Sequence, residues 1–167
     1  MVMSMDSTEC NLIKSEACLS ECGKYRYWLS RIWNESGDIG AFVCTNPSKA
    51  TSLLSDTTLS NCNNLAVQWG WGGFYIINIF AYMATNQNDM RAQADPNGPK
   101  NDEAITSISN TTECVVLAWG NGHRSRSNQV LELLSKKKLY CIKRNTGGGF
   151  LHPSRIKSED YAQPVAI

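Results

Sequence analysis

The chain has 167 residues, of which 42 % are hydrophobic and 19 % are charged. This length allows one domain with a buried core, and the composition argues against disorder. A run of about 18 apolar residues, which would indicate a membrane-spanning helix, does not occur. The polar segment Met1 to Glu9 has no feature of a secretory signal. We expect a cytoplasmic protein without membrane contact, with an irregular lead-in over residues 1–22 and one domain over residues 23–167.

The seven cysteines raise the question of a metal site or disulfides. Their number is odd, no C-x-x-C pair occurs, and Cys10, Cys18 and Cys22 have no fourth neighbour at zinc-finger spacing. Cys44 and Cys114 stand in apolar runs, where a free cysteine packs as a small hydrophobe. We therefore expect reduced thiols, no metal and no cofactor.

The net charge of +1 conceals an uneven distribution of charge along the chain. Residues 1–100 carry 7 Lys/Arg and 9 Asp/Glu, whereas residues 101–167 carry 9 and 6. All nine late cations lie between Arg124 and Lys157, where Glu132 is the only acid, so this stretch holds +8. Such a block could contact a phosphate backbone. Alternatively, Lys136 to Lys138 simply solvate the end of a helix.

The first half of the chain predicts two helices and two strands. The spacing of Trp28, Leu29, Ile32 and Trp33 indicates a short helix. Residues 41–44 read as a buried strand that ends at Asn46-Pro47-Ser48, because proline interrupts a strand ladder. A helix over residues 49–69 and a glycine-rich turn over residues 69–73 follow. Residues 74–80 form the strongest strand pattern, being β-branched and aromatic.

The second half continues the alternation of strands and helices. We expect a polar loop over residues 85–100, a helix over 101–109, a strand over 114–119, a helix including 130–134 and a strand over 139–142. The remainder should be loop, including Gly147 to Gly149. Alternating strands and helices predict a three-layer α/β/α sandwich with a mainly parallel, four-stranded central sheet.

Polar residues follow the predicted strands at the edge where open α/β sheets bind ligands. Asn46 lies just past the first strand, Asn78 at the end of the second, Gly120-Asn121 past the third, and His152 beyond the fourth. We expect a site where Asn46, Asn78 and His152 meet.

These segments resemble, in the same order, the uracil-DNA glycosylase superfamily. Thr45 to Ser48 resembles its water-activating loop, Tyr75 to Phe80 the strand with its base-reading asparagine, Val116 to Gly120 its apolar strand ending in glycine, and Leu151 to Ile156 its histidine loop. More closely, Tyr25 to Ser154 is similar to an uncharacterised bacterial and phage domain family with Tyr-Arg-Tyr, Asn-Pro-Ser, Asp-x-Thr (Asp56, Thr58), Trp-Gly and His-Pro motifs.

The resemblance implies a DNA base-excision N-glycosylase with a uracil-DNA glycosylase-like fold, acting on a damaged or modified base. Its catalytic residues would be Asn46, which positions water, and His152, which stabilises the departing base. Asn78 would read the flipped base, with Pro47 and Ser48 beside it. The nucleic-acid backbone would be contacted by Arg124, Arg126, Lys143, Arg144, Ser154 and Arg155.

Each of these residues also has a structural interpretation. Asn46 could cap a helix, Asn78 could satisfy a structural hydrogen bond, and His152 could be a surface loop residue. Two other functions therefore stay open. One is a nucleic-acid or nucleotide-binding module of the same fold without catalysis, and the other is an N-glycosidase on free nucleosides or nucleotides.

Overall fold

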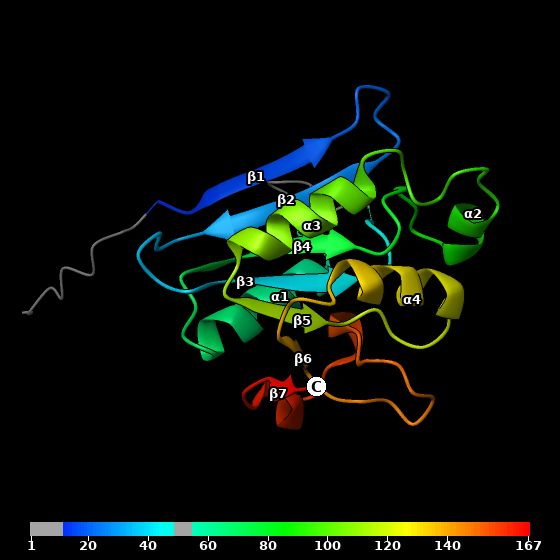
Figure 1. Ribbon diagram of the computed structural model, residues 1–167. Helices are drawn as coiled ribbons and strands as arrows, with labels where there is room; N and C mark the ends of the chain where they lie inside the picture. Colours follow the sequence, from blue (N-terminus) through cyan, green and yellow to red (C-terminus); the bar gives the residue numbers. More distant parts are fainter. Residues whose placement is uncertain (1–11, 49–54) are drawn as a thin grey trace, which may run out of the picture.

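The computed structural model describes residues 12–48 and 55–167, which fold around one mixed β-sheet (Figure 1). In this part of the chain the sheet has seven strands in the order β1-β2-β4-β3-β5-β6-β7. Their bounds are β1 (Lys14–Leu19), β2 (Arg26–Ile32), β3 (Ile39–Cys44), β4 (Gly73–Asn78), β5 (Cys114–Leu117), β6 (Leu139–Cys141) and β7 (Val165–Ala166).

Helices cover both faces of the sheet. The helix α1 (Thr57–Gln68) packs on one face, and α3 (Asn101–Thr111) and α4 (Arg124–Leu133) pack on the other (Figure 1). The short helix α2 (Gln87–Arg91) and the 3-10 turns η1 (Pro153–Arg155) and η2 (Ser158–Tyr161) lie in the connections. The strand period of two explains the two cores: Phe42 belongs to the α1 core, whereas its neighbours Ala41 and Val43 belong to the other.

The prediction of a four-stranded, mainly parallel sheet is wrong. The four strands expected from the sequence correspond to β3, β4, β5 and β6, and their mutual pairings are parallel. Three further strands extend this sheet with antiparallel pairings, since β1 pairs with β2, β2 with β4, and β7 with β6. The strands β1 and β7 are polar or very short, so neither shows the continuous apolar run of a buried parallel strand.

The short helix predicted from Trp28, Leu29, Ile32 and Trp33 is also wrong, because Arg26–Ile32 form β2 and Trp33 directly follows it. A cluster of apolar residues this short fits a helix or a strand that is covered on both faces. In the fold, Leu29 packs in the α1 core, while Trp28 meets the Tyr75 ring on the opposite face at a centroid distance of 5.6 Å. Hydrogen-bonded pairing with β1 and β4 therefore makes this segment a strand rather than a helix.

Other local predictions differ from the structure at their bounds. The helix expected over residues 49–69 is described from Thr57, with Asp56 as its N-cap, and residues 49–54 lie outside the described residues. The loop expected over residues 85–100 contains α2, and the irregular lead-in expected over residues 1–22 contains β1. Residues 1–11 lie outside the described part of the chain. Within that part, no helix has the length and apolar character needed to cross a membrane.

Candidate functional site

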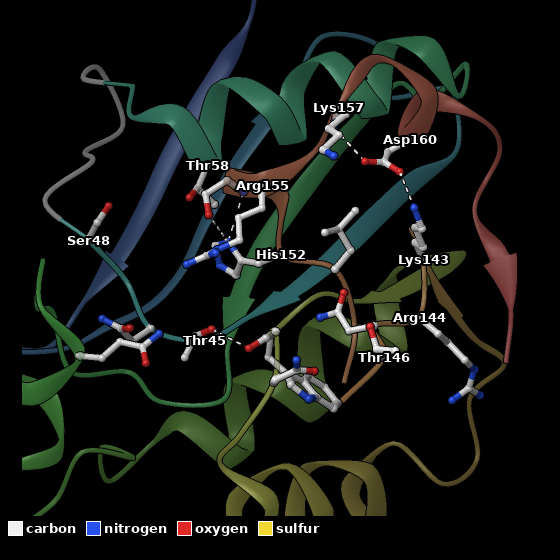
Figure 2. A pocket seen from close by; sticks show the side chains of 18 of the residues that line it. Thr45, Ser48, Thr58, Lys143, Arg144, Thr146, His152, Arg155, Lys157 and Asp160 are labelled. Carbon is white, nitrogen blue, oxygen red and sulfur yellow. Dashed lines mark hydrogen bonds and ion pairs between the residues drawn. The ribbon is translucent and has the colours of Figure 1, made fainter. Parts of the chain in front are cut away.

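A cavity of about 800 Å³ opens at the carboxyl ends of β3, β5 and β6 (Figure 2). Residues that directly follow these strands line it, and so does the first turn of α1 through Thr58. The segment from Leu151 to Arg155, which contains His152, forms another part of the cavity wall. Several side chains predicted from the sequence meet here, namely Asn46, Ser48, Lys143, Arg144, His152, Ser154 and Arg155.

The amide of Asn46 is held in one orientation by two backbone carbonyls. Its Nδ2 donates to the oxygen of Ala84 at 2.8 Å and to that of Pro47 at 3.2 Å. Because both partners are acceptors, the nitrogen must face them and the oxygen must face the other way. Within the described residues Oδ1 has no hydrogen-bond donor, so the acceptor of Asn46 is available to a ligand or water in the cavity.

The imidazole of His152 is oriented by the turn that follows it. Its Nδ1 accepts from the backbone N–H of Ser154 at 3.2 Å and lies 2.8 Å from the hydroxyl of the same residue. The neutral ring therefore carries its proton on Nε2. Pro153 fixes the start of η1 and is buried, which holds this turn against the protein. His152 thus offers one defined donor, Nε2–H.

Two buried thiols, Cys44 and Cys62, interact with each other, and Cys44 also interacts with His152. Cys44 ends β3, directly before Thr45 of the cavity wall, and Cys62 belongs to α1. Hydrogen bonding from Cys62, and next from His152, lowers the pKa of the Cys44 thiol to about 6, although burial acts in the opposite direction. Because Nδ1 is occupied by Ser154, Nε2–H is the ring donor available both to Cys44 and to a ligand.

The cations of the cavity differ in how far they are neutralised. Lys143 Nζ lies 3.6 Å from the buried carboxylate of Asp160, and the Arg144 guanidinium stacks on the Phe150 ring at 5.5 Å. Arg155 forms no ion pair within the described residues and is exposed. In Figure 2 it lies on the same side of the pocket as His152, whereas the Arg144 side chain points away from that histidine. Arg155 therefore keeps its charge for an anionic ligand, and so does Lys157, which lines the cavity, is exposed and forms no ion pair within the described residues.

Two residues predicted to bind a base do not line the cavity. Asn78 is 2 % exposed, and its backbone oxygen accepts from the buried Asn101 side chain. Its Nδ2 has no hydrogen-bond partner in the described part of the chain. Because Asn78 and Cys44 are register partners in parallel strands, their side chains project from the same face of the sheet. Pro47 is buried beside Asn46 and is also outside the lining.

Two predicted backbone contacts lie elsewhere. Arg126 is 6 % exposed, donates from Nε to the oxygen of Ile79 at 2.7 Å, and pairs with Asp102 at 2.5 Å. Its charge therefore ties α4 to α3 and to the end of β4 rather than facing a ligand. Arg124 is exposed on the first turn of α4, outside the cavity lining.

Sequence reasoning placed Thr45 and Asn121 near this edge of the sheet but assigned neither a role in the site. Thr45 is 3 % exposed and donates to the oxygen of Trp119 at 2.9 Å, which joins the ends of β3 and β5. Asn121 accepts from the N–H of Gly149 at 3.1 Å. A Cβ on Gly149 would stand 2.0 Å from the oxygen of Gly120, so this glycine allows close approach to the chain itself. A polar residue directly after a buried strand was the available signal for Thr45.

The chemistry of the site rests on amide, imidazole, hydroxyl and cationic groups. Among the described residues, no group of three His, Cys, Asp or Glu side chains is arranged to hold a metal ion. The described cysteines are free thiols: Cys18, Cys22, Cys44, Cys62, Cys114 and Cys141. Such a site can orient water, donate a hydrogen bond to a developing anion and bind phosphate.

Comparisons with known proteins identify a family for most of the chain. The comparison with curated proteins found no match, and neither did the comparison with solved structures. A family described as "Protein of unknown function (DUF1643)" matches residues 26–154, a span that runs from β2 through η1 and includes Asn46, His152 and Ser154. The chain therefore belongs to the DUF1643 family.

Proposed function

We propose that the protein is an N-glycosylase that hydrolyses the bond between the sugar and a damaged or modified base in DNA. The observation that carries the proposal is the position of Asn46 and His152 in one cavity, each with a single group left for a ligand. A resemblance of four ordered sequence segments to the uracil-DNA glycosylase superfamily supports the same reaction.

The reaction needs an acceptor on one side of the sugar and a donor at the base. As the bond between C1′ and the base nitrogen breaks, its electron pair leaves with the base and positive charge develops on the sugar. Water held by Asn46 Oδ1 adds its oxygen to C1′, and one of its protons ends on the released base. Nε2–H of His152 donates to an oxygen of the base and stabilises its negative charge.

The basic residues that line the cavity would bind a phosphate of the substrate. Arg155 and Lys157 line the cavity on the segment that carries His152, so a phosphate bound there would lie beside the reacting sugar. Phosphate contacts of this kind position a strand without reading its sequence. We still propose that Asn78 forms hydrogen bonds with the base. Its buried Nδ2 lacks a partner in the described residues, and a base oxygen reaching the end of β4 would satisfy it.

A base-release assay with single-site variants tests the proposed reaction. Purified protein is incubated with single- and double-stranded oligonucleotides that carry a panel of modified bases, and the released base is quantified. We expect Asn46→Ala and His152→Ala each to lower the rate by about 10²–10³, as removal of one preorganised donor does elsewhere. Asn64→Ala on the exposed face of α1 and His123→Ala outside the cavity are the matched controls.

The outcomes separate catalysis from binding. Release at an unchanged rate by both cavity variants would refute the assigned roles. Tight DNA binding without release of any base would instead identify a nucleic-acid-binding module.

A free nucleotide is the second candidate substrate, and the distribution of charge favours it. Four of the nine late cations line the cavity, namely Lys143, Arg144, Arg155 and Lys157. Arg126 is buried and neutralised, so the basic block does not form a continuous track along the protein. A compact cluster suits one phosphate better than a long duplex. The same variants assayed on modified nucleoside monophosphates decide between the two substrates, because an enzyme for free nucleotides needs no oligonucleotide.

A further inference from the structure

A buried cation lies near the Asn46 loop but outside the cavity lining. Arg26 of β2 is 4 % exposed, although its guanidinium is a charged group. Burial lowers the pKa of Arg26, and the negative charge of Asp56 acts against this shift. Buried charges are generally kept near a counter-charge, because removing an ion from water is otherwise costly. The acid whose negative charge acts on Arg26 is Asp56, the N-cap of α1.

The carboxylate of Asp56 also makes two directed hydrogen bonds. Its Oδ1 accepts from the backbone N–H of Leu59 at 2.8 Å and thereby caps α1. Its Oδ2 accepts from the hydroxyl of Ser48. Ser48 stands two residues after Asn46 and lines the same cavity (Figure 2). One side chain therefore joins α1 and the loop after β3, and its charge acts on β2.

The loop that carries Asn46 is thus held both by Ala84, whose N–H also donates to the oxygen of Pro47 at 3.0 Å, and by Asp56. On one side, the oxygen of Ala84 binds the Asn46 amide at 2.8 Å, and on the other, Asp56 binds Ser48. Between them, Pro47 restricts the backbone and is buried. If the bond between Ser48 and Asp56 is lost, the loop keeps both Ala84 contacts but loses its hydrogen bond to the N-cap of α1. A displacement of about 1 Å is enough to disturb a catalytic group.

We propose that Asp56 is a positioning residue, which holds Asn46 in place through Ser48. The catalytic consequence rests on the proposed function, whereas the structural consequence does not. Asp56 touches no substrate in this scheme. It sets where Oδ1 of Asn46 stands, and therefore where the water or ligand that Asn46 binds must lie.

The test compares Asp56→Asn with a variant that weakens α1 elsewhere. Asparagine caps a helix about as well as aspartate, so Asp56→Asn keeps the cap but removes the charge. Asn64→Gly lies on the exposed face of the same helix, leaves Asp56 untouched and lowers helix stability through its backbone entropy. Ser48→Ala removes only the hydroxyl between Asp56 and the loop. Thermal unfolding reports the stability of each variant.

The readout is hydrogen exchange of the Asn46 side-chain amide, followed by nuclear magnetic resonance. We expect Asp56→Asn and Ser48→Ala each to speed this exchange by about tenfold or more, the effect of losing one charge-assisted hydrogen bond. The double variant should exchange no faster than the faster single variant, because both substitutions break one linkage. Asn64→Gly should leave the exchange unchanged at any comparable loss of thermal stability.

Activity provides a second readout that separates this proposal from the proposed reaction. If base release is observed, Asp56→Asn should lower kcat by about 10²-fold with little change in KM, as expected for a misplaced catalytic group. If no base is released by the wild-type protein, the proposed function fails and the exchange data alone decide the positioning role. Unchanged Asn46 exchange in Ser48→Ala overturns the positioning role, even if Asp56→Asn does not fold.

Discussion

Replacing Arg126 by alanine should destabilise the fold, although the sequence places this residue among candidate contacts to nucleic acid. The guanidinium is 6 % exposed and donates from Nε to the oxygen of Ile79 at 2.7 Å. Loss of a hydrogen bond from a charged donor costs about 1.5–3 kcal/mol. The pair with Asp102 adds about 0–1 kcal/mol, because the side chain of Asp102 is 58 % exposed and screened by water.

These contributions give an expected loss of about 1.5–4 kcal/mol in the free energy of unfolding. The loss should stay below the upper end of this range, because the oxygen of Ile79 also accepts from Asn101 at 3.3 Å and therefore keeps a donor in the variant. For a chain of this length, the corresponding fall in Tm is about 3–16 °C. Urea unfolding followed by tryptophan fluorescence measures the loss directly, because Trp119 is buried in the core beside α4.

Arg124→Ala is the matched control, since it makes the same substitution two residues earlier on an exposed position of α4. It should change the free energy of unfolding by less than about 0.5 kcal/mol. A second comparison uses Arg155→Ala, which should lower the salt dependence of DNA or nucleotide binding, whereas Arg126→Ala should not. The reasoning fails if Arg126→Ala is as stable as Arg124→Ala and weakens binding instead.

Two further substitutions test the packing that supports the site. In Gly40→Ala, the new Cβ would stand 2.2 Å from the Trp71 ring, so we expect a loss of about 1–3 kcal/mol by urea unfolding. Wild-type stability would show that the ring moves freely. In Thr45→Val, the buried oxygen of Trp119 loses its hydroxyl donor at nearly constant volume, which should cost about 1–3 kcal/mol in the same assay. A neutral result would mean that water replaces the hydroxyl.

The central strands could be predicted from the sequence because their signal is local. The segments now seen as β3 to β6 are short apolar runs that end at glycine, proline or polar residues. A parallel strand covered on both faces needs such a run, whatever its partners are. The antiparallel strands β1 and β7 carry exposed and partly polar residues, so only their pairing partners reveal them. A relationship of the chain to the uracil-DNA glycosylase superfamily stays a proposal.

The positions of Asn46 and His152 could also be anticipated, because both follow predicted strands on the edge where such sheets bind ligands. The burial of Asn78 and Arg126 could not be anticipated from the sequence. Both are polar residues near the same edge in the sequence, yet the register of β4 buries one, and the packing of α4 on α3 buries the other. Which side a residue faces depends on contacts with segments far away in the chain, and a single sequence does not contain them. The sequence alone therefore determined which polar groups stand near the sheet edge, and the tertiary structure decided which of them face the cavity.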